Sequence, residues 1–269
     1  VSSGVRRVEG RLSSIVGSAK RGIATVGKLA GALGLVGLAY KGIDMVKKSL
    51  DGAIDRYDTL NNFPRVMQVL GFDAMESEKA IQRLADGIQG LPTRLDEVAS
   101  TAQNIAVMTG DLDSAVDTTL ALNNAFLASG ASVADASRGM EVYQNMLATG
   151  QVDAQRWKTL QETMGVALRM VAEQAGFEGP EALDKLYAAL KDGTITFDEF
   201  NSMLIEANNA QDGLADLARE NTDGLGTAWM NLEAWIIDGL AKVIKAIDLA
   251  MGGVGTISGA INRLKPVVQ

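Results

Sequence analysis

The chain contains the stretch Val5-Arg-Arg-Val8-Glu-Gly-Arg-Leu12-Ser-Ser-Ile15, in which apolar residues recur at spacings of three and four. The pattern continues to residue 57 as two heptad series, which are Val5, Leu12, Ala19, Val26, Leu33, Tyr40, Lys47 and Ile54, and Val8, Ile15, Gly22, Leu29, Val36, Ile43, Leu50 and Tyr57. A narrow apolar seam kept over this many heptads is typical of helices paired with other helices. We therefore predict a coiled-coil arm over residues 1–57, about 80 Å long at about 1.5 Å per residue. The residues expected at its oligomer seam are Val5, Val8, Leu12, Ile15, Val26, Leu29, Leu33, Val36 and Ile43.

The composition indicates an all-α protein. The 269 residues include no cysteine, no histidine and only four prolines. The β-branched and aromatic residues that strands favour are sparse. The missing residue types exclude thiolate chemistry, disulfides, the usual zinc sites and imidazole acid–base catalysis. We predict helices throughout and no cofactor.

Charge is distributed unevenly along the chain. Residues 1–50 contain nine Lys/Arg and two Asp/Glu, a local +7, whereas residues 51–222 contain twelve and twenty-seven, a local −15. Such asymmetry indicates separate surroundings or partners for the two segments. A basic arm suits nucleic acid, anionic lipid or an acidic partner, and a solvated helix face explains it equally well. The absence of an initiator Met and the abrupt end suggest a fragment of a longer chain.

The middle of the chain contains local start and stop signals for a series of short helices. We expect the arm to end near Pro64, where a short helix begins and runs to Gly71. The residues that we expect to cap later helices are Asp73 with Glu76, Thr93, Ser132 with Asp135, Asp153, and Thr196 or Asp198. Gly110, Gly130, Gly150 and Gly176 mark helix ends, and Gly165 marks an interruption. The sequence thus predicts a compact helical domain over residues 58–222.

Residues 223–269 form a predicted second arm. Trp229, Leu232, Trp235, Leu240 and Ile247 recur at helical spacing, which indicates an amphipathic helix. Small-residue GxxxG spacings, which let helices pack closely in membranes, occur at Gly27 and Gly31 and at Gly255 and Gly259. The uncharged runs around them are too short to span a bilayer. Helix packing and conditional insertion into a membrane both remain open, and Trp229 and Trp235 suit either.

Candidate sites for chemistry are weak. Asp192-Gly-Thr-Ile-Thr-Phe-Asp-Glu199-Phe resembles the second half of a calcium loop, but the first and third ligand positions would be Ala188 and Leu190. A tight turn at Gly193 is the better interpretation. The pairs Asp111 with Asp113 and Asp96 with Glu97 lie near predicted helix starts, where carboxylates are favoured without catalysis. We expect no catalytic, metal or cofactor site and no enzyme.

Six motifs in the middle of the chain occur in a specific order. They are Tyr57-Asp-Thr-Leu-Asn-Asn-Phe-Pro-Arg-Val-Met67, Asp86-Gly-Ile-Gln-Gly-Leu-Pro92, Met108-Thr-Gly-Asp-Leu-Asp113, Leu122-Asn-Asn-Ala-Phe-Leu-Ala-Ser-Gly130, Trp157-Lys-Thr-Leu-Gln-Glu-Thr-Met-Gly165 and Leu186-Tyr-Ala-Ala-Leu-Lys-Asp-Gly-Thr-Ile-Thr-Phe-Asp-Glu-Phe200. Together they resemble the tape-measure domain of long-tailed bacteriophages and prophages of Gram-positive hosts, over roughly residues 50–222.

The resemblance implies a structural virion protein that lies in the lumen of the tail tube. It implies that the chain sets tail length, assists tube assembly in the host cytoplasm, and leaves the tube on infection to help the genome cross the host envelope. The implied partners are its own copies, expected as a trimer, tube and tail-tip or baseplate proteins, assembly chaperones and the host membrane. No sequence-specific contact with nucleic acid is expected. The seam residues alone do not choose two strands over three.

Two other function classes compete with this interpretation. A membrane-active pore-forming or lytic protein is suggested by the two GxxxG segments and would lyse cells without a virion. A helical adaptor or scaffold would bind tail proteins without any effect on lipid. The six body motifs favour the tape-measure interpretation over both.

Overall fold

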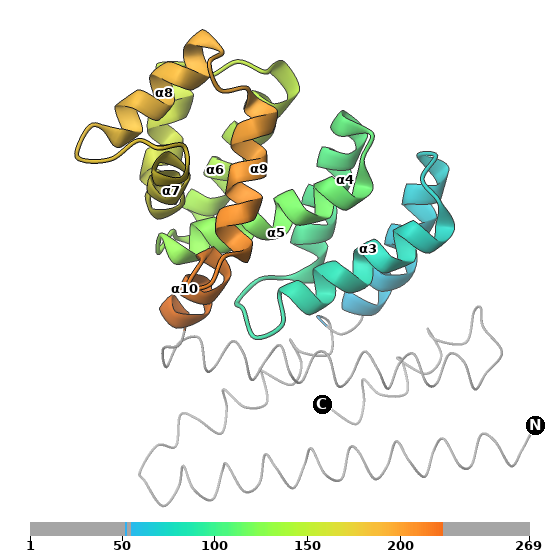
Figure 1. Ribbon diagram of the computed structural model, residues 1–269. Helices are drawn as coiled ribbons and strands as arrows, with labels where there is room; N and C mark the ends of the chain where they lie inside the picture. Colours follow the sequence, from blue (N-terminus) through green and yellow to red (C-terminus); the bar gives the residue numbers. More distant parts are fainter. Residues whose placement is uncertain (1–51, 53–54, 223–269) are drawn as a thin grey trace, which may run out of the picture. The chain divides into compact units, whose positions relative to one another are not determined.

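The structure is a computed structural model that describes residues 52 and 55–222, and within these residues it contains helices and turns and no strand (Figure 1). The all-α prediction is confirmed. A helix at residues 55–69 comes first. It is followed by α3 (Ala74–Gly87), α4 (Leu95–Thr109), α5 (Leu112–Ala128), α6 (Val133–Thr149), α7 (Ala154–Gln174), α8 (Ala182–Asp192), α9 (Phe197–Asn209) and α10 (Leu214–Asn221). The predicted domain boundaries stay predictions, because residues 1–51 and 223–269 lie outside this description.

Most helices begin at a side-chain cap that the local sequence provides. The side chains of Asp73, Asp111, Ser132, Asp153 and Thr196 each accept a hydrogen bond from a backbone N–H two or three residues later. Such a bond satisfies a backbone donor that the first helical turn leaves unpaired. Glycines in the left-handed region follow α4, α6 and α8, as the stop signals predict.

Two predicted helix boundaries are wrong. Thr93 does not cap α4, because its hydroxyl donates instead to Asn123 Oδ1 of α5, at 2.8 Å. Pro64 does not end a helix, because residues 55–69 are helical without a break. A proline inside a helix removes one backbone hydrogen bond and typically costs about 3 kcal/mol. Phe63 and Met67 on either side of it are buried in the core, and their burial offsets this cost.

The core is organised around α5, which contacts α3, α4, α6, α7, α9 and α10. In Figure 1, α3 and α4 lie on one side of α5, and α6 to α8 lie on the other. Alanine, leucine and valine side chains on several faces of α5 are buried, as expected for a helix surrounded by others. It also buries polar groups that the apolar pattern did not predict. Thr118 accepts a hydrogen bond from Asn201 Nδ2 at 2.9 Å, and Asn124 Nδ2 donates to Asn208 Oδ1 at 2.8 Å, which joins α5 to α9 twice.

An aromatic cluster joins α6, α7, α8 and α9. Its members are Tyr143, Trp157, Tyr187, Phe197 and Phe200, with ring centroids between 5.2 and 6.5 Å apart. The Tyr143 hydroxyl donates to Asn201 Oδ1 at 2.5 Å. Burial raises the pKa of Tyr143 above its ordinary value, and the nearby Asp198 carboxylate raises it further. The cluster therefore holds a neutral phenol whose polar end is satisfied.

The interruption predicted at Gly165 occurs one residue earlier. Met164 is fully buried and has non-helical dihedral angles, φ −138° and ψ 37°, so α7 consists of two helical segments that meet at this residue. Gly165 itself has open space around it. The bend is therefore associated with the buried methionine side chain rather than with a crowded glycine.

Candidate interaction surface

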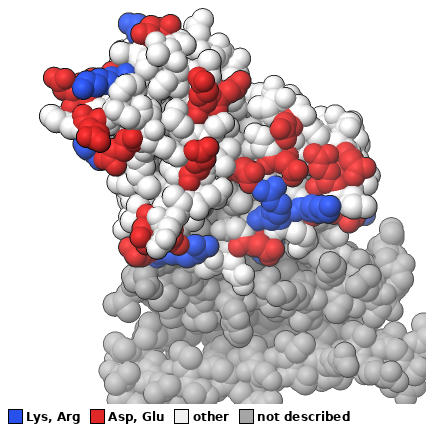
Figure 2. Space-filling model, viewed as in Figure 1, with Lys and Arg blue, Asp and Glu red and all other residues white. Residues whose placement is uncertain are grey.

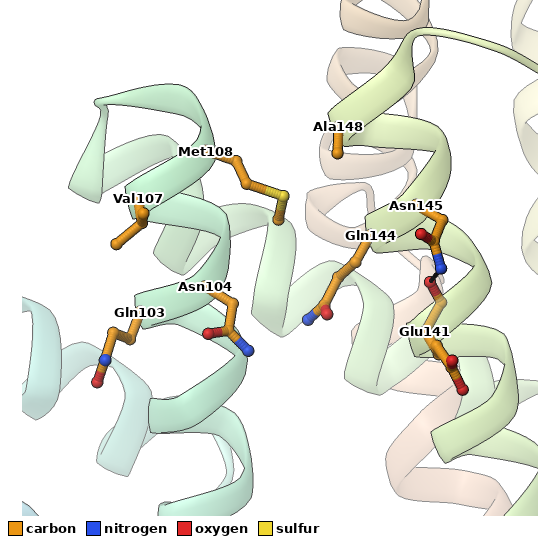
Figure 3. A pocket seen from close by; sticks show the side chains of 8 residues that line it. All are labelled: Gln103, Asn104, Val107, Met108, Glu141, Gln144, Asn145 and Ala148. Atoms are coloured by element: carbon orange, nitrogen blue, oxygen red, sulfur yellow. Dashed lines mark hydrogen bonds between the residues drawn. The ribbon is translucent and has the colours of Figure 1, made fainter.

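A groove of about 530 Å³ separates α4 from α6 (Figure 3). Gln103, Asn104, Val107 and Met108 line it from α4, and Glu141, Gln144, Asn145 and Ala148 line it from α6. Figure 3 shows Gln144 extending from α6 toward Asn104 and Met108 of α4. Here α4 packs mainly against α5 and α6 mainly against α7, so the two helices contact each other only slightly.

The groove presents carboxamides that the rest of the described structure leaves unused. Gln103, Asn104 and Gln144 make no side-chain hydrogen bond with other described residues, and Asn145 uses only its amide nitrogen, which donates to the Glu141 carbonyl at 3.0 Å. A primary amide offers two donors and an acceptor. The groove can therefore hydrogen-bond to a neutral polar or peptide surface on both of its walls.

The electrostatic character of the groove is mildly negative. Glu141 is exposed and forms no ion pair with the described residues, and no Lys or Arg lines the groove. The helices α4 and α6 both end at the same end of the groove, and neither has a basic residue in its last turn. Helix C-termini carry partial negative charge. A ligand with positive charge is therefore favoured over one with negative charge.

A second exposed surface is apolar. Val66, Val69 and Leu70 lie three and four positions apart at the end of the helix at residues 55–69, and Met75 follows in the first turn of α3. The exposed fraction of Val69 is 88 % and that of Met75 is 64 %. Exposed apolar side chains one helical turn apart, such as Val66, Val69 and Leu70, are typical of a contact surface.

The acidic surface is only partly compensated. Figure 2 shows carboxylates spread over the visible face of the described residues, with basic side chains beside acidic ones. Arg83 pairs with Asp113 and Asp117, and Arg138 pairs with Asp135 at 3.2 Å and with Glu162 at 3.4 Å. Exposed pairs of this kind contribute little to stability, because water screens the attraction between the charges. The excess of carboxylates therefore matters more for the choice of partners than for stability.

The segment from Asp192 to Phe200 forms the predicted turn. Gly193 has φ +80°, and the Thr196 side chain and the Glu199 side chain form reciprocal hydrogen bonds at the start of α9. The backbone N–H and then the hydroxyl of Thr196 lower the pKa of Glu199. Hydrogen bonds from the hydroxyl and then from the backbone N–H of Thr194 lower the pKa of Asp192. The carboxylates that resemble calcium ligands thus serve the turn and the cap.

The predicted carboxylate pairs also lie at helix starts. Asp111 is the N-cap of α5, and Asp113 lies in its first turn; Asp96 and Glu97 lie in the first turn of α4. The described residues contain no cluster of three or more side chains of the kinds that hold a metal ion. None of the described helices has the length and apolar character needed to cross a bilayer.

The other predicted site residues lie outside the described part of the chain. They are the seam residues between Val5 and Ile43, the glycines at 27, 31, 255 and 259, and Trp229 and Trp235. The groove, by contrast, was missed by sequence reasoning. Its only sequence signal is the run of uncharged amides on the exposed faces of two helices, and nothing in the sequence places those helices opposite each other.

Comparison with known protein families shows to which family the chain is related. The profile of the family described as "Tape measure protein" matches residues 51–245, which is more than half of the chain and includes all the helices named above. The chain belongs to the tape measure protein family. Comparisons with curated proteins and with solved structures found no match. The predicted resemblance is confirmed, and a tape measure protein is a structural component of a phage tail.

The region that matches the family can be located on the described helices. It begins before the helix at residues 55–69 and continues beyond α10. The α4–α6 groove and the exposed apolar side chains around Val69 therefore both lie within the region that matches the tape measure protein family.

Proposed function

We propose that the chain lies in the lumen of a phage tail tube, sets tail length, assists tube assembly in the host cytoplasm, and on infection leaves the tube and helps the genome cross the host envelope. The family match over residues 51–245 carries this proposal. The heptad pattern before residue 57 supports it, because a helix has a fixed rise per residue and can serve as a ruler.

The proposal assigns a structural role and no enzymatic activity. The carboxylates that could suggest chemistry are accounted for by helix caps, first helical turns and ion pairs. The groove and the apolar group around Val69 are suited to binding other polypeptides. The proposed partners are copies of the chain, as a trimer, together with tube, tail-tip or baseplate proteins and assembly chaperones.

A change in ruler length tests the tail-length role directly. Tandem duplication of residues 5–57 in the phage gene adds 53 residues, and the tail is expected to lengthen by about 80 Å at about 1.5 Å per residue. Electron microscopy of purified tails measures the change. Deletion of the same residues should shorten the tail by the same amount. Infectious particles with tails of unchanged length would contradict a ruler role for this segment.

The membrane step is tested separately. The segments around Gly27 and Gly31 and around Gly255 and Gly259 favour it, because their spacing permits close helix packing in lipid. Purified protein is expected to release dye from anionic liposomes, and replacement of Gly255 and Gly259 by Leu should reduce the release. A protein that neither binds nor permeabilises liposomes, at neutral or acidic pH, would remove the membrane step and leave a helical scaffold.

A further inference from the structure

The groove between α4 and α6 has a shape that can accept a helix. On α6, Glu141, Gln144, Asn145 and Ala148 lie at positions i, i+3, i+4 and i+7, so they form one stripe along the helix. On α4, Met108 points across the groove toward α6 (Figure 3), and both Met108 and Val107, which also lines the groove, are exposed. The lining thus combines a small apolar part, Val107, Met108 and Ala148, with polar side chains on both helices, and an amphipathic helix can use both kinds of contact.

The side chains of the groove also suit a partner with irregular packing. Met108 is flexible and polarisable, and Ala148 leaves room for a neighbouring side chain. The unused amides of Asn104 and Gln144 can bond to serine or threonine hydroxyls, or to a backbone that small residues expose. A rigid, fully apolar helix would leave these amides without partners, which is unfavourable.

The charge of the groove indicates the sign of the charge that a binding partner should carry. The groove contains one carboxylate, that of Glu141, which has no ion-pair partner among the described residues, and it ends at two helix C-termini with no basic residue in their last turns. The chain itself contains a segment of matching chemistry. Residues 1–50 combine nine Lys/Arg and two Asp/Glu with an apolar heptad pattern and frequent serine and glycine. We call this the basic segment.

We propose that the α4–α6 groove binds the basic segment of a second copy of the chain. The two surfaces differ, so the contact is heterologous, and a contact of this kind closes into a ring when the rotation between copies permits. The inference concerns assembly of the chain with itself and does not depend on its location in the tail tube.

Site-specific photocrosslinking of the full chain tests the proposal. The chain has no cysteine, so Gln144→Cys introduces a single thiol in the groove, to which a benzophenone maleimide is attached. Equal amounts of ¹⁵N-labelled and unlabelled protein are mixed, irradiated and digested. Mass spectrometry then distinguishes crosslinks between copies from those within one copy.

The expected result is a set of crosslinks between copies that join position 144 to peptides from residues 1–50. Lys158→Cys provides a matched control, because its side chain is 76 % exposed on α7 and does not line the groove; this position should give few such crosslinks. Glu141→Lys should lower the yield from position 144 about threefold to tenfold, because it replaces attraction by repulsion. Glu141→Gln should have a smaller effect, and rising salt should lower the yield.

Three results would overturn the proposal. The first is crosslinking only within one copy, or none at all. The second is crosslinking between copies that maps outside residues 1–50. The third is an unchanged yield in Glu141→Lys protein that retains the parent helical content and melting temperature, since Glu141 is exposed and the substitution leaves the core intact.

Discussion

Gly139→Ala tests how closely three helices pack at one point. Gly139 lies on α6, and a Cβ atom at this position would lie 2.5 Å from Cε1 of Phe126 on α5 and 2.6 Å from Oγ1 of Thr163 on α7. The site cannot relax freely, because Tyr143 one turn later is fully buried and bonded to Asn201. We expect the substitution to destabilise the domain.

The size of the effect follows from two opposing terms. Ordinary contacts between carbon atoms are about 3.5–4.0 Å, so two neighbours on different helices must each move by about 1 Å. Overpacking of this kind costs about 1–3 kcal/mol, and two simultaneous contacts place the cost near the upper value. Alanine is better than glycine in a helix interior by about 1 kcal/mol. The net expectation is a loss of about 2 kcal/mol, or about 4–8 °C in melting temperature.

The assay is urea and thermal unfolding of the full chain followed by far-ultraviolet circular dichroism. Gly165→Ala is the matched control, because nothing lies within 4 Å of the added Cβ. It adds a methyl group next to the interruption of α7 without overpacking and should stabilise the domain by at most about 1 kcal/mol. If both variants shift the free energy of unfolding in the same direction and by the same amount, the close packing described around Gly139 is refuted.

Four further predictions concern polar groups. Thr196→Ala should cost about 1 kcal/mol of unfolding free energy, because it removes the cap of α9. The pKa of Glu199 is lowered in the folded state. The stability that its carboxylate contributes is therefore present above the ordinary pKa of a glutamate and is lost as the pH falls through the lowered pKa. We expect Glu199→Gln to reduce the loss of stability on acidification. Because burial raises the pKa of Tyr143, absorbance titrations of the parent protein and Tyr143→Phe should coincide until alkaline unfolding. Asn124→Ala should cost about 1–3 kcal/mol by leaving the Asn208 carbonyl without its partner, and adding Asn208→Ala should cost less than the sum of the two single changes.

Three of these predictions have a distinct contrary outcome in unfolding or absorbance measurements, and an unchanged free energy of unfolding in Thr196→Ala would contradict the fourth. An acid unfolding curve unchanged by Glu199→Gln would show that the carboxylate does not support the cap. An early phenolate signal that disappears in Tyr143→Phe would show that this phenol is solvated. Strictly additive costs at Asn124 and Asn208 would show that the two amides are not coupled.

One part of the candidate site could be predicted from the sequence, and another part could not. The turn at Gly193 and its cap were predictable, because Thr196 and Glu199 lie three residues apart and bond to each other's backbone. The groove was not, because its walls come from α4 and α6, which are separated along the chain by the whole of α5. Whether two exposed helix faces form a groove depends on how each helix packs against a third.

The sequence by itself determined the all-α class, the positions at which most helices begin and end, and the tape-measure family. These features rest on interactions within a few residues, such as the hydrogen bond that the Asp135 N–H donates to the Ser132 side chain, or on ordered local motifs. Only the tertiary structure decided that Thr93 would bond to Asn123 rather than cap α4, and that a helix would continue through Pro64. In both cases, contacts between residues distant in the sequence stabilised the structure by more than the local preference for a cap or a helix end did. No local sequence pattern indicates which distant residues will come into contact.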